Sequence, residues 1–330
     1  LVTELKKLQE QVPPVPFAAI RAAVEESLGA PLTEVFSRFD EQPLGSASIG
    51  QVHRAALRRP PEDPATIDHA DVVVKVRRPG VDRTVARDLN LLRRLAVVVE
   101  RVLPETRLYS PRALVEHFDQ AITTEMHFCV EADHAERFAQ NFAGVPGVRF
   151  PRVYRSASTR DVLTLAFFGG CKISGVVAAG HSGSLLAKQA VAVIIKMIFE
   201  DGFFHADPHP GNIIILGPPQ APVIGLIDLG MVGRLGPELR DRTLDLLMAA
   251  GRKDPQGVAD ALYTIGRPTG KVDMNAYRAE VALLAEKYLG RPLKEIEVSS
   301  LVRDIVGGAS KYGIEVPPDF MLVGKTLMTL

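Results

Sequence analysis

Apolar residues recur with helical spacing near the start of the chain. Phe17, Ile20, Val24 and Leu28 lie on one face of a helix, and Gly29 stands where that helix would end. The spacing therefore predicts a helix over residues 17–28. Shorter helices are predicted on either side of it, over residues 1–11 and 31–39.

The pattern then changes to that of β-strands. Residues 46–57 have a β-type pattern, and residues 71–76 contain four valines in six positions, which is typical of a strand. Two further strands are predicted over 148–154 and 162–168, before the pair Gly169-Gly170.

Two long helices are expected between these strands, over residues 81–103 and 111–142. The first has an apolar inner face and a basic outer face, formed by Arg83, Arg87, Arg93 and Arg94. A solvated helix face is the simpler interpretation of these arginines. Contact with an anionic lipid surface is the alternative.

The rest of the chain is predicted to be mainly helical, with helices over 184–201, 237–250, 254–265, 273–289 and 299–310. A β-containing first half and a helical second half predict an α+β protein of two lobes. We assign residues 1–40 to a helical extension, 41–168 to an N-terminal lobe and 169–330 to a C-terminal lobe.

Composition narrows the possible functions. The 330 residues include 39 Lys and Arg against 39 Asp and Glu, so the formal charge is zero and no basic excess favours nucleic-acid binding. Two cysteines cannot form a disulfide framework, which favours a reducing, cytoplasmic setting. No apolar run reaches the roughly 18–20 residues of a membrane helix. Because the chain starts at Leu1 and ends within an apolar helical pattern, we expect it to be a piece of a longer protein.

The strongest chemical signal is the run His-Ala-Asp-Pro-His-Pro-Gly-Asn, which places Asp207 and Asn212 five residues apart. This is the spacing of the catalytic Asp and the metal-binding Asn in the kinase loop H-R-D-x-x-x-x-N. Asp228 opens Asp-Leu-Gly after an apolar run, where kinases have Asp-Phe-Gly. Phosphoryl transfer needs a carboxylate that orients the acceptor, and Mg²⁺ held by oxygen ligands. Asp207 is thus the candidate catalytic residue, and Asn212 and Asp228 are candidate Mg²⁺ ligands.

Two other interpretations of this run stay open. The prolines and Gly211 are also typical of an ordinary turn. His205 and His209 could instead bind a transition metal, although that site would need more ligands than the sequence places nearby.

Upstream residues follow kinase order. Residues 45–52 fit G-x-G-x-x-G-x-V with Ala47 at the second glycine, and Lys75 follows three valines, like the strand lysine that binds nucleotide phosphates. The candidate ATP-binding residues of this loop are Gly45, Ser46, Ala47, Ser48, Ile49, Gly50 and Val52. A glutamate of the helix over 111–142 should pair with Lys75, and spacing alone leaves Glu116, Glu125, Glu131 and Glu136 open.

Taken together, residues 47–53, 74–81 and 203–212 resemble the UbiB/ADCK (aarF-domain) family of atypical kinases. The resemblance covers nearly the whole chain and implies a protein-kinase-like fold, ATP and Mg²⁺ as cofactors, and ATPase activity. It also implies a role in isoprenoid-quinone or lipid metabolism at membranes, with a lipid or quinone precursor as a further ligand.

By position, the resemblance makes Glu131 the partner of Lys75, and it places Ala166 and Phe168 at the hinge beside the nucleotide. The chain departs from the family in two places. His127 replaces the Asp of a Glu-x-Asp element that begins at Glu125, and Gly45-Ser46 replaces two alanines of the loop. A Lys-x-Gly-Gln helix of the family is expected before Leu1.

The acceptor is a separate question. Only residues 231–236 separate Asp-Leu-Gly from the next predicted helix, and no Ala-Pro-Glu anchor of protein kinases follows. A small molecule, a lipid or water is therefore the expected acceptor, in preference to a protein. The alternative function is that of a pseudokinase, a switch that binds nucleotide without turnover.

Overall fold

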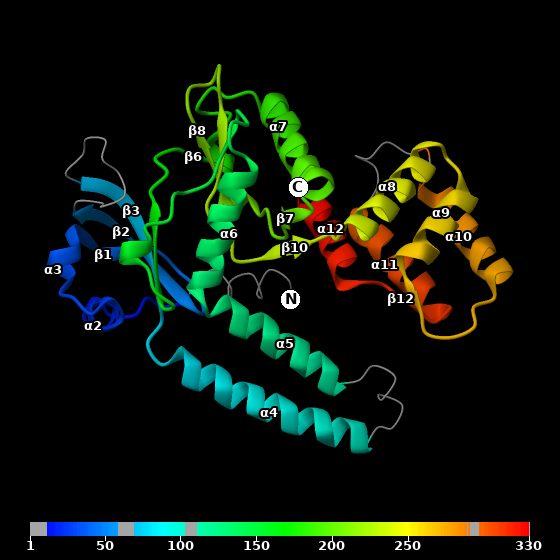
Figure 1. Ribbon diagram of the computed structural model, residues 1–330, viewed down its shortest axis with the longest axis horizontal. Helices are drawn as coiled ribbons and strands as arrows, with labels where there is room; N and C mark the ends of the chain where they lie inside the picture. The colour runs from blue at the N-terminus through cyan, green and yellow to red at the C-terminus, as the bar shows by residue number, and fades with distance from the viewer. Residues whose placement is uncertain (1–11, 59–68, 103–110, 289, 291–296, 330) are drawn as a thin grey trace. The chain divides into compact units, whose positions relative to one another are not determined.

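The computed structural model describes residues 12–58, 69–102, 111–288, 290 and 297–329. The chain forms two compact units (Figure 1). The first comprises Leu1–Gly144, Arg149–Gly169 and Ile227–Gly230, and the second comprises Val145–Val148, Gly170–Leu226 and Met231–Leu330. The helix predicted over 1–11 lies outside the described residues.

An antiparallel sheet of order β1-β2-β3-β5 forms the centre of the first unit. Its strands are β1 (Phe36–Ser46), β2 (Gly50–Arg58), β3 (His69–Arg77) and β5 (Val162–Ala166). The predicted strand at 71–76 is confirmed, and the one predicted over 162–168 is confirmed up to Ala166. The helix predicted over 31–39 is wrong beyond Val35, because α3 covers only Leu32–Val35 and Phe36 then pairs with Leu57 of β2.

The side chains of β3 alternate between the two faces of the sheet, which separates its buried valines from Lys75. Val72, Val74 and Val76 are fully buried on one face of the sheet, in one cluster with Ile20 and Val24 of helix α2 (Phe17–Leu28). Successive strand residues point to opposite faces. Lys75 therefore stands on the other face, away from this apolar core.

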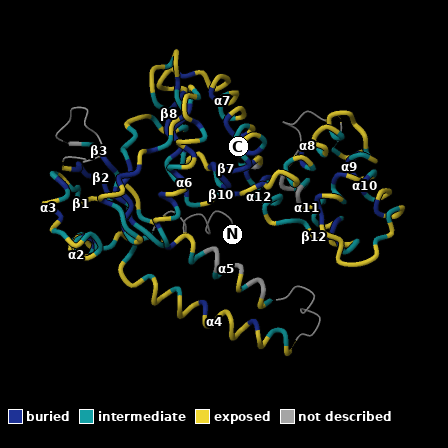
Figure 2. The backbone as a smooth tube through the Cα atoms, in the orientation of Figure 1, coloured by how far each residue is buried: buried dark blue, intermediate teal, exposed yellow. Residues whose placement is uncertain are grey.

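The helix predicted over 111–142 is two helices, α5 (Pro111–Glu125) and α6 (Phe128–Asn141). The helix is interrupted at Met126 and His127. The N–H of Phe128 donates to the carbonyl of Arg160 at 3.0 Å and not to a carbonyl of α5. Helix α4 (Val81–Val102) packs beside α5 (Figure 1). Figure 2 shows α4 exposed along most of its length, and only Leu89 and Ala96 are buried.

The second unit contains more strand than the sequence predicted. A small sheet has the order β4-β9-β8-β6, and β7 pairs with β10. The strands are β4 (Val148–Arg149), β6 (Cys171–Lys172), β7 (Phe203–His205), β8 (Ile213–Leu216), β9 (Val223–Leu226) and β10 (Val232–Arg234). These strands have two to four residues each, too few to show a period of two. The strand predicted over 148–154 is wrong beyond Arg149, where β4 ends.

The predicted helices of the second unit are confirmed with small changes in their ends. They are α7 (Gly183–Ile195), which a π-helical turn over Lys196–Glu200 follows, α8 (Pro237–Gly251), α9 (Pro255–Ile265), α10 (Met274–Tyr288), α11 (Val298–Lys311) and α12 (Pro318–Thr329). A two-residue pair, β11 (Arg267–Pro268) and β12 (Ile314–Glu315), joins the segments after α9 and α11. Among the described residues, no helix combines the length and the apolar character that a bilayer crossing requires.

Candidate functional site

Three predicted site residues lie together in the first unit. The ammonium Nζ of Lys75 lies 2.5 Å from Oε1 of Glu131 and 3.5 Å from Oδ1 of Asp228. The side chains of Lys75 and Glu131 are 16% and 8% exposed, whereas that of Asp228 is 48% exposed. A buried ion pair thus stands beside a carboxylate that solvent reaches.

Charge and burial oppose each other in this cluster. Burial alone would lower the pKa of Lys75, but the carboxylates of Glu131 and Asp228 outweigh it and raise that pKa. Burial also raises the pKa of Glu131, more than the charge of Lys75 lowers it. The charge of Lys75 therefore favours the ionised form of Glu131, against the effect of burial.

The main chain next to Asp228 is fixed by α6. Oε1 of Glu131 accepts a hydrogen bond from the N–H of Leu229 at 3.3 Å, and Nδ1 of His134, one turn later, lies 3.0 Å from the carbonyl oxygen of Leu229. Because a carbonyl only accepts, the proton of that imidazole lies on Nδ1. One helix face therefore holds the lysine partner and anchors the Asp-Leu-Gly segment.

Of the four glutamates that spacing left open, the structure selects Glu131. Glu116 is exposed on α5, and Glu136 pairs with Arg155 through Oε2 at 2.7 Å. Glu125, at the end of α5, is close enough to the cluster for its pKa to respond, because burial, and then the charge of Asp228, raises it. Nε2 of His127 is buried and has no hydrogen-bond partner among the described residues.

The predicted phosphate-binding loop is the turn between β1 and β2. The N–H of Ala47 donates to the carbonyl of Gly50 at 2.8 Å, and the carbonyl of Ile49 accepts from the N–H of Arg78 at 2.9 Å. Val52 pairs directly with Lys75 across the sheet, which places the loop and the lysine on neighbouring strands.

Two glycines of this loop differ in what they require. A Cβ added at Gly50 would lie 3.2 Å from Cζ of Phe128 and 3.3 Å from the carbonyl oxygen of Val76, so a side chain there would press on both neighbours. A Cβ at Gly45 would meet nothing within 4 Å. Gly45 and Ser46 form the last two residues of β1, and Ser48 lies between the strands.

The predicted hinge residues lie at the end of β5. Ala166, its last residue, pairs with Val72, and the N–H of Phe167 donates to the carbonyl of Asp71 at 3.0 Å. Phe168 follows and is half-buried. The role of Ala166 and Phe168 in binding nucleotide stays a prediction.

The predicted catalytic loop belongs to the second unit and follows β7. The N–H of Ala206 donates to the carbonyl of Met231 at 3.0 Å, which continues the pairing of β7 with β10 up to Asp207. The side-chain amide of Asn212 donates to the carbonyl of Asp207 at 3.3 Å. Its nitrogen is thus engaged within the loop, and its amide oxygen is the group that suits a hard cation.

A residue that sequence reasoning missed contacts Asp207. Nζ of Lys325, in α12, lies 3.3 Å from Oδ1 of Asp207. The hydroxyl of Thr326, which is fully buried, donates to the carbonyl of His205 at 3.2 Å. Helix α12 therefore contacts both Asp207 and the last residue of the strand before the loop. A single cation within the apolar run from Phe320 to Leu330 was the available signal.

Both histidines of the transition-metal alternative form hydrogen bonds to backbone N–H groups of the loop. Nδ1 of His209 accepts from the N–H of Gly211 at 3.1 Å and caps the short helix that contains Asn212. Nδ1 of His205 lies 3.2 Å from the backbone nitrogen of Asp207. Within the described ranges, no three His, Cys, Asp or Glu side chains gather as a metal site would need.

Replacing Lys75 by Met tests the buried pair. Glu131 would lose its partner, so we expect the free energy of unfolding to fall by about 3–5 kcal/mol at pH 7. Because burial already raises the pKa of Glu131 above 4.5, the loss should shrink as the pH falls through that raised pKa and Glu131 becomes neutral. Urea denaturation between neutral and acidic pH measures this.

Two further variants serve as controls. Lys75→Met combined with Glu131→Gln removes the unpaired charge and should recover most of the lost stability. Lys188→Met, on an exposed face of α7, should change it by less than about 0.5 kcal/mol. A loss for Lys75→Met that did not depend on pH would contradict the assigned role of Glu131.

The chain matches two protein-family models. The model of the "ABC1 atypical kinase-like domain" matches residues 7–262, and that of the "UbiB helical domain" matches residues 281–330. The relative named "Probable protein kinase UbiB" in Marinobacter nauticus is 32% identical over 334 residues, which cover 100% of this chain and 59% of the relative. The relative of the same name in Pseudomonas putida is 34% identical and matches over 100% of this chain and 60% of its own length. The chain thus spans about three fifths of the length of these relatives.

A solved structure has the same fold. It is the complex of Rv3197 with erythromycin from Mycobacterium tuberculosis, with a TM-score of 0.66 and 21% identity, covering 99% of this chain and 82% of that one. The mixed helix-and-sheet fold predicted from the sequence is confirmed. The chain belongs to the ABC1/UbiB family of atypical kinase-like proteins.

Proposed function

We propose that the chain binds Mg-ATP and catalyses hydrolysis of ATP or transfer of its γ-phosphoryl group to a small acceptor. The observation that carries this proposal is the cluster of Lys75, Glu131 and Asp228, a cation held between two carboxylates, one of which is open to solvent. In kinases this arrangement grips nucleotide phosphates and the metal ion.

Each residue has a proposed role. Lys75 contacts phosphate oxygens, Glu131 holds Lys75 ionised, and Asp228 and the amide oxygen of Asn212 are the Mg²⁺ ligands. Bound Mg²⁺ would neutralise charge on the phosphates. Asp207 orients the acceptor hydroxyl or water and takes its proton as the bond from the γ-phosphorus to ADP breaks and the bond to the acceptor oxygen forms.

We assign Lys325 a positioning role in this reaction. Its ammonium group is a direct partner of the Asp207 carboxylate and comes from a helix that also anchors the strand before the loop. A fixed cation at this point favours the orientation of Asp207 and the negative charge that develops on the transferred group.

The acceptor we propose is water or a small molecule, including a lipid or quinone precursor, in support of isoprenoid-quinone or lipid metabolism. Residues 231–236 are occupied by β10 and its flanks, and the N–H of Leu235 donates to the carbonyl of Gly202 at 2.9 Å. This segment offers no long loop on which a peptide could dock.

ATP turnover tests the proposal. We expect Asp207→Asn and Asp228→Asn each to lower kcat by about 10²–10⁴-fold, since each removes a carboxylate that acts at the reacting group or its metal ion. Lys325→Met should lower kcat about tenfold with little change in KM for ATP, because Lys325 acts through Asp207. Phosphate release under saturating Mg-ATP measures these effects.

The matched controls are Asp245→Asn, exposed on α8, and Lys311→Met, whose lysine pairs with Glu280. Both should turn over ATP like the unchanged chain. Turnover that survives loss of both Asp207 and Asp228 would contradict the enzyme proposal. Binding of Mg-ATP without turnover would instead support the pseudokinase alternative, for which His127 is the relevant departure from the family.

We further propose that α4 lies on an anionic membrane surface, on the cytoplasmic side. Leu91, Leu95, Val98 and Val102 form one stripe along the helix and are 58%, 49%, 54% and 67% exposed. A row of exposed arginines follows one edge of this stripe: Arg83, Arg87, Arg94 and Arg101. An exposed apolar stripe with a basic border is the pattern of a helix that lies in a lipid interface.

The structure changes one residue of the basic face expected from the sequence. Arg93 forms an ion pair with Asp119 of α5, so it faces the neighbouring helix. Arg101 takes its place along the exposed edge. Arg83, Arg87, Arg94 and Arg101 thus border the apolar stripe, which stays exposed among the described residues.

Co-sedimentation with vesicles tests this proposal. Leu95→Ser combined with Val98→Ser should lower binding to vesicles of phosphatidylcholine and phosphatidylglycerol several-fold, because it removes half of the stripe. Leu283→Ser, at a leucine that is 67% exposed on α10, is the matched control and should bind like the unchanged chain. Two results would contradict the proposal. One is equal binding of the unchanged chain, the double variant and Leu283→Ser. The other is that the unchanged chain binds vesicles of phosphatidylcholine alone as well as it binds vesicles that contain phosphatidylglycerol.

A further inference from the structure

The helices of the second unit line a partly open apolar cavity that the proposed reaction does not use. Its volume is about 270 Å³, and its lining comes from α8, α9, α10, α11 and the residues up to the start of α12. None of the described residues that line it is charged. An apolar cavity of about 150 Å³ stays free of water and takes up benzene, so this one has room for a larger apolar group.

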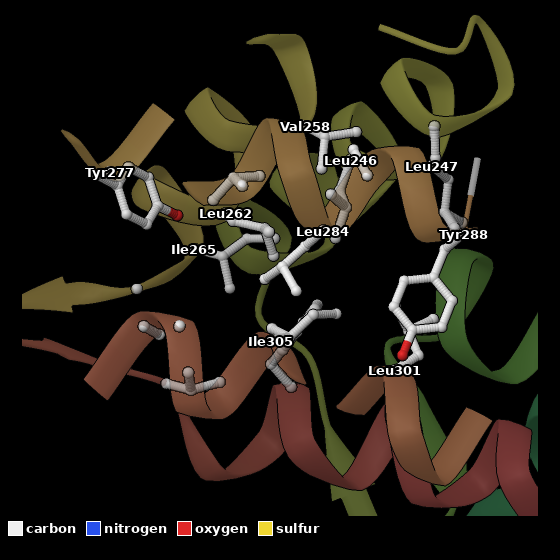
Figure 3. A pocket seen from close by; sticks show the side chains of 18 residues that line it. Leu246, Leu247, Val258, Leu262, Ile265, Tyr277, Leu284, Tyr288, Leu301 and Ile305 are labelled. Atoms are coloured by element: carbon white, nitrogen blue, oxygen red, sulfur yellow. The ribbon is translucent and has the colours of Figure 1, made fainter. Parts of the chain in front are cut away.

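The cavity is elongated along α10. Tyr277, Val281, Leu284, Ala285 and Tyr288 all line it, and they occupy one face of that helix. Tyr288 lies eleven residues after Tyr277, a rise of about 16 Å along the helix axis. In Figure 3, Tyr277 and Tyr288 stand at opposite ends, with Leu284 between them. A volume of 270 Å³ spread over that length is narrow, which suits a single chain better than fused rings.

The two ends of the cavity differ. Tyr277 is 2% exposed, and its hydroxyl is turned toward Leu262 and Ile265 in Figure 3. At the other end, the hydroxyl of Tyr288 donates to Oδ2 of Asp304 at 2.6 Å, and Nζ of Lys287 lies 2.8 Å from the same oxygen. The cavity therefore has a buried apolar end and an end with a polar rim.

We propose that this cavity binds one hydrocarbon chain of an uncharged amphiphile, with its tail toward Tyr277 and its polar head at the rim formed by Tyr288, Asp304 and Lys287. A hydrocarbon tail fills the space with the contacts that an empty cavity lacks. The rim offers hydrogen-bond donors and acceptors but no net charge. The inference is independent of ATP turnover.

Neighbouring glycines of α11 provide a matched pair of variants. A Cβ at Gly308, which lines the cavity, would meet only Cδ1 of Leu284, at 3.4 Å, so a larger side chain there extends into the cavity. A Cβ at Gly307 meets nothing within 4 Å, and Gly307 is exposed. Leucine favours a helix equally at either position. Gly308→Leu therefore fills the cavity, and Gly307→Leu makes the same exchange outside it.

The experiment is calorimetric titration of the full 330-residue chain with dodecanol, with naphthalene as the ring-shaped comparison, supported by the thermal midpoint. We expect dodecanol to bind the unchanged chain and Gly307→Leu alike and to bind Gly308→Leu at least tenfold more weakly. Leu284→Trp, which fills the same space from α10, should weaken it similarly and serves if Gly308→Leu does not fold. Absence of binding to the unchanged chain, undiminished binding to the filled variants, or tighter binding of naphthalene would overturn the proposal.

Discussion

The structure of the first unit depends on a cation that is buried between two carboxylates. Lys75 and Glu131 lie in contact in an environment that penalises either charge alone, so each keeps the other ionised. A well-packed apolar pair would be easier to accommodate there. The same lysine lies 3.5 Å from Asp228, whose carboxylate is partly exposed. In the function that we propose, this carboxylate binds the metal ion and Lys75 contacts the phosphates.

The surrounding main chain is arranged around this pair. The break between α5 and α6 sets the start of α6 so that Glu131 and His134 both reach Leu229, one through its N–H and the other through its carbonyl. Along the chain, Gly230 is followed by Met231, whose carbonyl accepts from Ala206 just before Asp207. The Asp-Leu-Gly segment of the first unit and the loop with Asp207 in the second unit are thus close together along the hydrogen-bonded backbone.

Sequence reasoning succeeded where a pattern was long or a motif was dense. The valines of β3, the face of α2 and the spacing of Asp207 and Asn212 each carried enough information to predict their place. It failed at the short strands of the second unit, whose apolar runs of two to four residues match a buried helix equally well. It also extended a helix through Met126 and His127, because the hydrogen bond that ends it comes from Arg160, far along the chain. Lys325 was missed for the same reason: its partner is 118 residues away in sequence, and only the fold reveals it.

The central claim is that Lys75, Glu131 and Asp228 together form a site for the phosphates and metal ion of a nucleotide. Calorimetry tests this directly. The affinity for ATP is measured with and without Mg²⁺, for the unchanged chain and for Asp228→Asn. The account predicts that Mg²⁺ strengthens ATP binding to the unchanged chain at least tenfold and that this gain is lost in Asp228→Asn. ATP affinity that is the same with and without Mg²⁺, or the same Mg²⁺ gain in both proteins, would contradict it.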